Sequence, residues 1–173
     1  MNPRLSVIVG RIEQLALDAV VNAANRELRP GNGVDGALRA AAGPELTALT
    51  RTLAPIAEGE AILTPGFKAP ARHIIHTAAP IYFLPGDKLE KIAALARCYA
   101  NAIALAETHR FATLAFPCLG TGNFGWPREM ARDIAIGATT QALAAAPNIA
   151  SVIFCCFTEA DAALYGSTLR QRL

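Results

Sequence analysis

The sequence carries little charge and has no block of charge of one sign. Only 17% of its residues are charged, the formal net charge is +2, and the lysine and arginine residues are scattered along the chain. Surfaces that bind long polyanions usually carry clustered basic side chains. The composition therefore disfavours a nucleic acid polymer as a partner, whereas a small phosphorylated ligand is compatible with it.

Long hydrophobic runs are also missing. No stretch approaches the roughly 20 apolar residues that a membrane-spanning helix needs. The apolar segment near the N-terminus, within MNPRLSVIVGRIEQ, is too short for the core of a secretion signal and lacks a small-residue cleavage site. We therefore expect a cytoplasmic protein with no membrane partner.

Cysteine and histidine are few and do not form a metal-binding pattern. The four cysteines include no C-x-x-C pair, and we predict that they are reduced thiols of the core, Cys118 included. His76 lies in the apolar segment IIHT, where a buried histidine with satisfied hydrogen bonds is favoured over a catalytic one. The sequence predicts neither a bound metal nor a cofactor.

Apolar residues are abundant, at 53%, and they alternate between two kinds of segment. Short β-branched runs alternate with longer stretches rich in alanine and leucine, which is typical of an α/β protein whose sheet is covered on both faces. Several of the runs are apolar at consecutive positions, as expected for strands buried on both faces. We predict one domain over residues 1–173, with strands at 6–10, 19–23, 59–64, 72–77, 113–117 and 151–157, and helices at 34–42, 44–53, 87–109, 127–146 and 159–172.

Ligands of open α/β sheets bind at the carboxyl ends of the strands. The segments that follow the second, fifth and sixth predicted strands contain most of the unusual residues, namely NAANRELRPGNGVDGA, CLGTGNFGWP and FTEADAALY. We expect these segments to meet at one edge of the sheet and to form a binding site there.

The first of these segments contains GNGVDG, which matches the dinucleotide-binding pattern G-x-G-x-x-G at Gly31, Gly33 and Gly36. The match is poor in context, because residues 25–30 separate it from the strand and no acidic residue ends the next strand. A nicotinamide-dependent oxidoreductase is therefore disfavoured, and it ranks third among the functions considered for this chain.

A second glycine loop follows the fifth predicted strand at residues 120–125. Two such loops at neighbouring strand ends can hold a diphosphate between them with backbone N–H groups, without basic side chains. The alternative is that the glycines only form tight turns. The presence of both loops favours the diphosphate site.

Four segments, DAVVNAANREL, VDGAL, RHIIHTAAP and FPCLGTGNFGWP, resemble the macrodomain family in order and spacing, from Gly10 to about Leu169. The resemblance implies a three-layer α/β/α sandwich around a mixed six-stranded sheet. It also implies that ADP-ribose, or a molecule that carries it, is the ligand.

The resemblance assigns a role to individual residues. Asn25 matches the asparagine that holds the distal ribose, whereas Asn22 matches a structural position, and Phe157 matches an aromatic residue that stacks on adenine. The two diphosphate loops are matched by Gly31, Gly33, Val34 and Gly36, and by Gly120, Thr121, Gly122, Asn123 and Phe124, of which Phe124 also lies against the distal ribose.

Asp35 matches the acidic residue of hydrolytic family members. A carboxylate beside a diphosphate cleft can orient or deprotonate a water molecule that attacks the distal ribose or an ester on it. The alternative is an aspartate placed in a first helical turn to interact with the helix dipole. The resemblance favours Asp35 and Asn25 as the catalytic pair.

The sequence departs from the family pattern where the base is recognised. Macrodomains usually have G-Asp-Ile-Thr where this chain has Gly10, Arg11, Ile12 and Glu13. Because arginine cannot accept a hydrogen bond, recognition at Arg11 and Ile12 is expected to be relaxed or shifted to another base, unless Arg11 points to solvent. The first loop also has Pro30 and Asn32 in place of glycines, and the second has Gly120 in place of a serine.

We thus expect a hydrolase of ADP-ribose derivatives, acting on mono-ADP-ribose attached to a protein carboxylate or on O-acetyl-ADP-ribose. A module that binds such nucleotides without turning them over is the second interpretation. Asp35 favours the enzyme, and the altered first loop favours the binding module.

Overall fold

The structure is a computed structural model that describes residues 2–171, and its centre is a six-stranded sheet. The strands lie in the order β1-β6-β5-β2-β4-β3, and only the pairing of β3 with β4 is antiparallel. The mixed six-stranded sheet predicted from the resemblance is confirmed. The strands are β1 (Leu5–Val9), β2 (Ala19–Ala24), β3 (Ala61–Pro65), β4 (His73–Ala78), β5 (Thr113–Phe116) and β6 (Ser151–Cys156).

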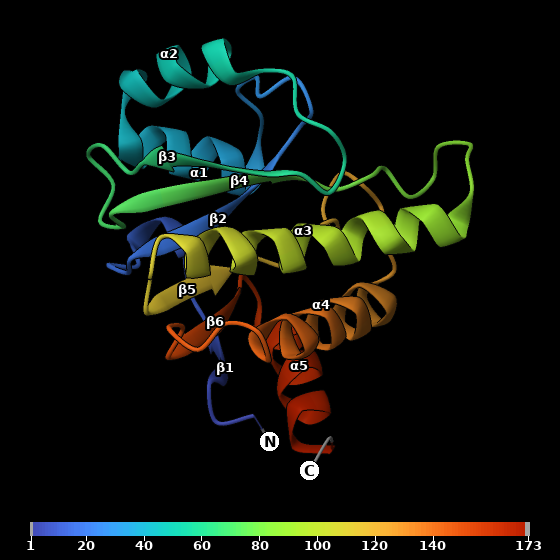
Figure 1. Ribbon diagram of the computed structural model, residues 1–173. Helices are drawn as coiled ribbons and strands as arrows, with labels where there is room; N and C mark the ends of the chain where they lie inside the picture. Colours follow the sequence, from blue (N-terminus) through green and yellow to red (C-terminus); the bar gives the residue numbers. More distant parts are fainter. Residues whose placement is uncertain (1, 172–173) are drawn as a thin grey trace.

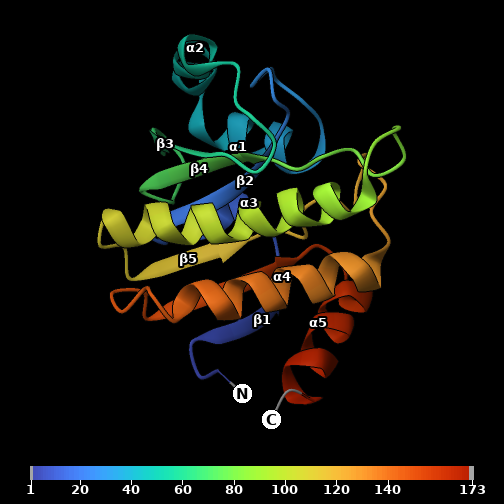
Figure 2. The ribbon, with the colours of Figure 1, turned by 45° about the vertical axis from the view of Figure 1, so that its right-hand side comes forward.

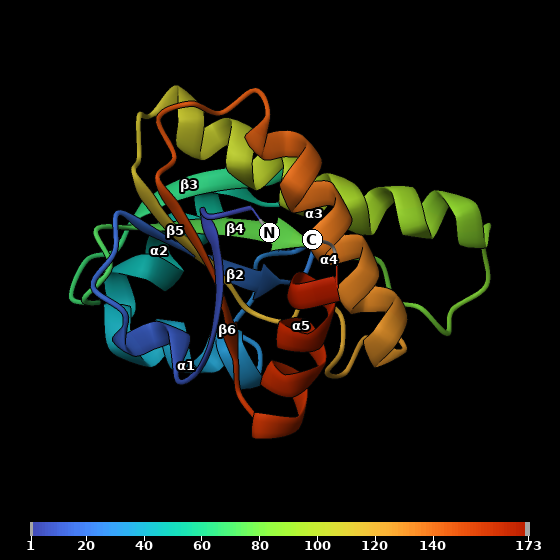
Figure 3. The ribbon, with the colours of Figure 1, turned by 90° about the horizontal axis from the view of Figure 1, so that it is seen from below.

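Five α-helices cover the two faces of this sheet and make it the middle of three layers (Figure 1). One face carries two helices and the other carries three, of which α3 and α4 lie side by side across the sheet (Figures 2 and 3). The first face is covered by α1 (Gly33–Ala42) and α2 (Pro44–Leu53), and the second by α3 (Lys88–Thr108), α4 (Arg128–Leu143) and α5 (Glu159–Gln171).

Strand β2 shows why consecutive apolar residues predict burial on both faces. Val20 and Val21 are both fully buried. Val20 packs in the cluster that contains Leu38 of α1, and Val21 packs in the cluster that contains Leu95 of α3. Successive side chains of a strand point to opposite faces, so each valine fills a different core.

The predicted elements are all present; α2 has the predicted ends, and the ends of the others are shifted. The helix predicted to reach residue 146 ends at Leu143, because its last turns tighten to contacts such as Ala146 N to Leu143 O before Pro147. The strand predicted at 59–64 lies at Ala61–Pro65. The short 3₁₀ helix η1 at Ile12–Gln14 was not predicted, and residue 172, in the last predicted helix, lies outside the described residues.

The carboxyl ends of β1, β2, β5 and β6 lie at the same edge of the sheet, because these strands run parallel. The segments that follow them therefore meet there, as predicted. Among residues 2–171, no helix is long and apolar enough to cross a membrane.

Candidate functional site

A cleft at the carboxyl ends of the parallel strands consists of two adjoining chambers of about 520 and about 480 Å³. Both volumes are in the range of small-molecule binding sites. The chambers share a waist, which is lined by residues from the start of α1 and from the segment after β5, namely Gly33, Val34, Pro117, Cys118 and Gly122.

The first chamber contains both residues predicted to be catalytic. Asn25 and Asp35 lie on its wall. The other predicted site residues on this wall belong to the two glycine loops and are Gly31, Gly33, Val34, Gly120, Gly122, Asn123 and Phe124.

The second chamber contains the residues that the resemblance assigns to the base. Phe157 stands at its mouth with 75% of its surface exposed, whereas Ile12 is buried. The remaining predicted site residues on this wall are Arg11, Gly33, Val34, Thr121 and Gly122. Gly36 is the one predicted ligand-binding residue that lines neither chamber, and a Cβ atom there would lie 2.9 Å from the Gly31 carbonyl oxygen.

The N-terminus of α1 forms one side of the waist. Helix α1 begins at Gly33, and the side chain of its N-cap residue, Asn32, makes no capping hydrogen bond. The first N–H groups of a helix have no partner within the helix and carry partial positive charge. Gly33 has a φ of +59°, and a Cβ atom there would have nothing within 4 Å, so the backbone faces open space. This waist suits an anionic group.

Asp35 is held by three donors. Its Oδ1 atom accepts a hydrogen bond from Asn22 Nδ2 at 2.7 Å, and its Oδ2 atom accepts from Gly31 N at 2.7 Å and from Arg39 Nε at 2.8 Å. Only 5% of the side chain is exposed. A carboxylate has about four lone-pair sites, so the protein fixes its orientation and leaves about one site unused.

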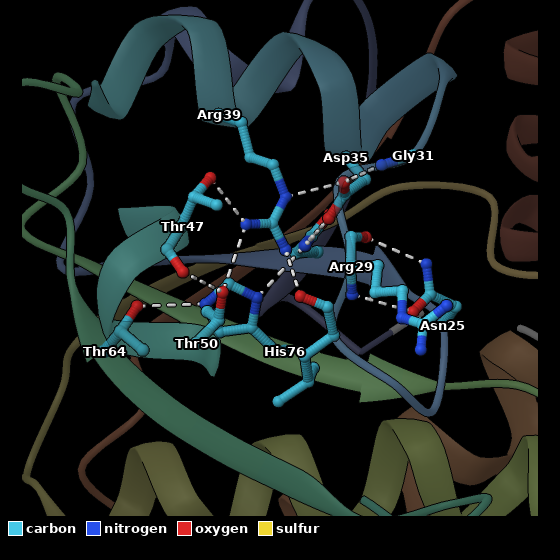
Figure 4. Close-up of polar contacts among 11 residues, drawn as sticks. Asn25, Arg29, Gly31, Asp35, Arg39, Thr47, Thr50, Thr64 and His76 are labelled. Carbon is cyan, nitrogen blue, oxygen red and sulfur yellow. Dashed lines mark hydrogen bonds and ion pairs between the residues drawn. The ribbon is translucent and has the colours of Figure 1, made fainter. Parts of the chain in front are cut away.

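Arg39 is the cation behind this carboxylate, and its guanidinium makes four hydrogen bonds (Figure 4). Its Nη1 atom donates to the hydroxyls of Thr47 and Thr50 at 3.1 Å each, and its Nη2 atom donates to the carbonyl oxygen of Leu28 at 3.0 Å. The contacts join α1 and the loop after β2, which both line the first chamber, to each other and to α2.

His76, in β4, extends the same hydrogen-bond network across the sheet, from Asn22 of β2 to Thr64 of β3. Asn22 Nδ2 lies 3.0 Å from His76 Nδ1, and His76 Nε2 lies 2.9 Å from Thr64 Oγ1. Because the amide is a donor, Nδ1 accepts and the ring proton is on Nε2. Burial lowers the pKa of His76 to about 4, the Arg39 cation also lowers it, and Asp35 acts in the opposite direction. The buried histidine with satisfied hydrogen bonds that the sequence predicts is confirmed.

Asn25 braces the loop that it begins. Its Nδ2 atom donates to the carbonyl oxygen of Arg29 at 2.9 Å, and its Oδ1 atom accepts from the N–H of Arg29 at 3.0 Å. This is the turn-stabilising use of asparagine considered above. The side chain nevertheless lies on the wall of the first chamber and keeps one N–H available for a ligand.

The second loop is fixed by Trp126. The Trp126 N–H donates to the Gly120 carbonyl oxygen at 3.0 Å, and its ring Nε1 donates to the Pro80 carbonyl oxygen at 2.8 Å. Gly120 has a φ of +83°, and a Cβ atom there would lie 2.5 Å from the Trp126 ring. Glycine is therefore required at 120, where the family often has serine.

Arg11 does not point freely to solvent. Its Nε atom donates to Glu13 Oε1 at 2.6 Å, with 56% of the Arg11 side chain and 13% of the Glu13 side chain exposed. Both residues line the second chamber, together with Asp161. Asp161 is already paired with Arg128 and with the hydroxyl of Thr158. The chamber thus contains hydrogen-bond acceptors although the expected aspartate is absent.

Several residues of the site were missed from the sequence, among them Arg39, Glu13, Asp161 and Cys118. Arg39 follows Asp35 by four residues in a predicted helix, so the spacing of an ion pair was visible. Glu13 depends on η1, a turn with no strong sequence signal. Cys118 was predicted to be a buried thiol, but it is only half-buried and lines both chambers.

Comparisons with known proteins agree with this geometry. A family model described as Macro domain matches residues 21–135. The chain is 46% identical to a macro domain-containing protein of Ralstonia nicotianae, over 92% of this chain and 91% of that protein. It is 38% identical to an O-acetyl-ADP-ribose deacetylase of Salmonella newport, over 99% of this chain and 97% of that protein. A solved structure of a mutant Oceanobacillus iheyensis macrodomain with ADPR is 34% identical in sequence and has a TM-score of 0.91. The match covers 99% of this chain and 95% of that chain.

Proposed function

Since this chain belongs to the macrodomain family, we propose that its cleft binds ADP-ribose and that the protein hydrolyses ester derivatives of that nucleotide. The substrates are O-acetyl-ADP-ribose or mono-ADP-ribose attached to a protein carboxylate. We further propose that the whole chain acts as one domain. The relative named as an O-acetyl-ADP-ribose deacetylase, which this chain matches over nearly its full length, supports the first substrate.

The observation that carries the proposal is the waist between the chambers. It joins the uncapped N-terminus of α1 to the second glycine loop, and none of the residues shared by both chambers is basic. Backbone N–H groups and the helix dipole can offset the charge of a diphosphate at this position. A nucleotide with its diphosphate at the waist extends its two ends into the two chambers.

The chambers differ in the way that the two ends of ADP-ribose differ. The second chamber has an exposed aromatic ring, Phe157, against which a base can stack. The first chamber presents the amide of Asn25 and the carboxylate of Asp35, which suit ribose hydroxyls. We therefore assign the base to the second chamber and the distal ribose to the first.

Asp35 then orients the water that hydrolyses the ester. Its remaining lone pair can accept a hydrogen bond from a water molecule beside the distal ribose, while three donors keep the carboxylate from rotating. The water attacks the ester carbonyl, and the bond to the ribose oxygen breaks, which yields a carboxylic acid and ADP-ribose. Asn25 holds the ribose in reach.

Calorimetric titration with ADP-ribose, together with an assay of acetate release from O-acetyl-ADP-ribose, tests the proposal. The parent protein is compared with Asp35→Asn, which keeps the shape of the side chain, and with Glu58→Gln, which alters an exposed carboxylate outside the cleft. We expect both variants to bind, and turnover by Asp35→Asn to fall at least about 100-fold. Unchanged turnover in Asp35→Asn would exclude a role of Asp35 in hydrolysis. If the parent protein does not bind ADP-ribose, this nucleotide is excluded as the ligand of the cleft.

A binding module without turnover is the second candidate. The involvement of Asp35 in three hydrogen bonds favours it, because an aspartate that holds a loop does not need to act on water. In that case ADP-ribose binds to the parent protein, and acetate release does not exceed that of the Asp35→Asn variant.

A further inference from the structure

Two cysteines meet behind the waist of the cleft. Cys118 follows β5, and Cys156 is the last residue of β6, the neighbouring parallel strand. Their sulfur atoms are 3.6 Å apart. A disulfide bond requires about 2.05 Å between the sulfurs, so a closing movement of about 1.5 Å would join them.

The two sulfurs differ in their access to the cleft. Cys118 is half-buried and lines both chambers, whereas Cys156 is fully buried behind it and lines neither. A small reagent that enters the cleft thus reaches Cys118 first. Cys156 can react only with a sulfur that is already next to it, which is Cys118.

The surroundings of Cys118 and Cys156 also change the pKa values of the two thiols in opposite directions. The hydrogen bond between the two sulfurs lowers the pKa of Cys118, and Tyr165 and Arg128 act in the same direction against burial and the charge of Asp161. The same contact raises the pKa of Cys156, and the burial of this thiol raises it further. Thiolates are the reactive form of cysteine. Cys118 is therefore the attacking thiol of the pair.

We propose that Cys118 and Cys156 are an oxidation site in which a hydroperoxide that enters the cleft produces an intramolecular disulfide. The Cys118 thiolate attacks the peroxide oxygen, the O–O bond breaks, and the leaving oxygen takes a proton to form water or an alcohol. Cys156 then attacks the sulfur of the resulting sulfenic acid, and water leaves with the Cys156 proton. The two thiols lose two electrons, which reduce the peroxide.

The disulfide changes the cleft because the second loop is attached to Cys118. The carbonyl oxygen of Cys118 accepts a hydrogen bond from Thr121 Oγ1 at 3.0 Å, and Thr121 lines the second chamber. Movement of Cys118 toward β6 therefore moves this wall. The expected effect of the disulfide on ADP-ribose binding rests on the proposed function, whereas formation of the disulfide does not.

Cys155 provides a matched control, because it is next to Cys156 in the sequence but packs on the opposite face of the sheet. Cys156 belongs to the core under α3, α4 and α5, and Cys155 belongs to the core under α1 and α2. Cys155 lines the second chamber, as Cys118 does, but it lies on the other face of the sheet from Cys156. The Cys155→Ser variant should still form the disulfide.

The test treats the full chain with hydrogen peroxide and follows its intact mass and its non-reduced peptide map. We expect the loss of two hydrogens and a peptide that links Cys118 to Cys156, in the parent and in Cys155→Ser. The Cys156→Ser variant should instead stop at a sulfenic acid on Cys118, which a 1,3-dione reagent traps. Reduced thiols in the treated parent, or a disulfide that joins other cysteines, would overturn the proposal.

A second arm repeats the oxidation with ADP-ribose present, after calorimetry has shown whether it binds. At a concentration of about ten times its Kd, a ligand that covers Cys118 should slow the oxidation about tenfold. Binding without protection would overturn the placement of Cys118 against the bound nucleotide. No binding would overturn the proposed function and leave the disulfide of the first arm standing.

Discussion

Asp35 and Arg39 form an ion pair that is closed to solvent on both sides. The carboxylate Oδ2 and the guanidinium Nε are 2.8 Å apart, one turn apart on α1, and the two side chains are only 5% and 7% exposed. The first turn of α1 also forms the waist of the cleft. The cation therefore fixes, from behind, the carboxylate that faces the first chamber.

Replacing Arg39 should destabilise the protein. The Arg39→Met variant leaves the buried charge of Asp35 without its cation, which costs about 3–5 kcal/mol in comparable buried pairs. Urea unfolding of the parent and the variant measures the difference in the free energy of unfolding. The double variant Asp35→Asn with Arg39→Met removes both charges and should recover part of the loss. A double variant that is no more stable than Arg39→Met would show that the unpaired charge is not the cause.

Sequence patterns predicted the parts of this protein that depend on short-range rules. Consecutive apolar residues such as Val20 and Val21 identified a strand buried on both faces, and the spacing of the glycine loops located the cleft. Contacts between distant segments left no such pattern. Cys118 and Cys156 meet only because β5 and β6 are neighbours, and Glu13 enters the second chamber only because η1 turns the chain.

Stability should fall in mild acid because His76 is buried and neutral. The pKa of His76 is about 4 in the folded protein, below its ordinary value of 6.5. Between these values the unfolded chain binds the proton and the folded protein does not, so the free energy of unfolding decreases as pH falls. We expect a loss of about 2 kcal/mol between about pH 7 and about pH 5.

The free energy of unfolding in urea, measured at both pH values, tests this expectation. The His76→Gln variant keeps an acceptor for Asn22 and has no proton to bind, so its stability should change less over this interval. An equal change in parent and variant would assign the acid sensitivity to other groups.

Glu13 should contribute to base recognition. Its carboxylate lines the second chamber and is held by Arg11 at 2.6 Å, in a chamber where the usual aspartate is replaced. An exocyclic amine that donates to this carboxylate gains a charge-assisted hydrogen bond, worth about 1.5–3 kcal/mol. The Glu13→Gln variant should therefore bind ADP-ribose about tenfold more weakly.

The hypoxanthine analogue of ADP-ribose is the control ligand, because it has a carbonyl in place of the amine. Its affinity should change little in Glu13→Gln. If both nucleotides lose affinity equally, Glu13 acts through Arg11 or through the chamber wall. If the parent prefers the hypoxanthine form, Arg11 has redirected the site to a base with an acceptor.

Two glycines of the second loop should separate folding from binding. In Gly120→Ala the new methyl group would lie 2.5 Å from the ring of Trp126, on a backbone with a φ of +83°. Overpacking and strain should cost at least about 1 kcal/mol of stability. In Gly122→Ala the methyl group would have nothing within 4 Å, and residue 122 lines both chambers. That variant should keep its stability.

The same two variants locate the ligand in the calorimetric titration. The methyl group of Gly122→Ala would project into the waist, so a diphosphate there must shift, which should weaken ADP-ribose binding about tenfold. Thermal unfolding without ligand shows that the loss does not come from folding. Parent-like affinity in a stable Gly122→Ala protein would place the diphosphate elsewhere, because a ligand at the waist cannot avoid the added carbon.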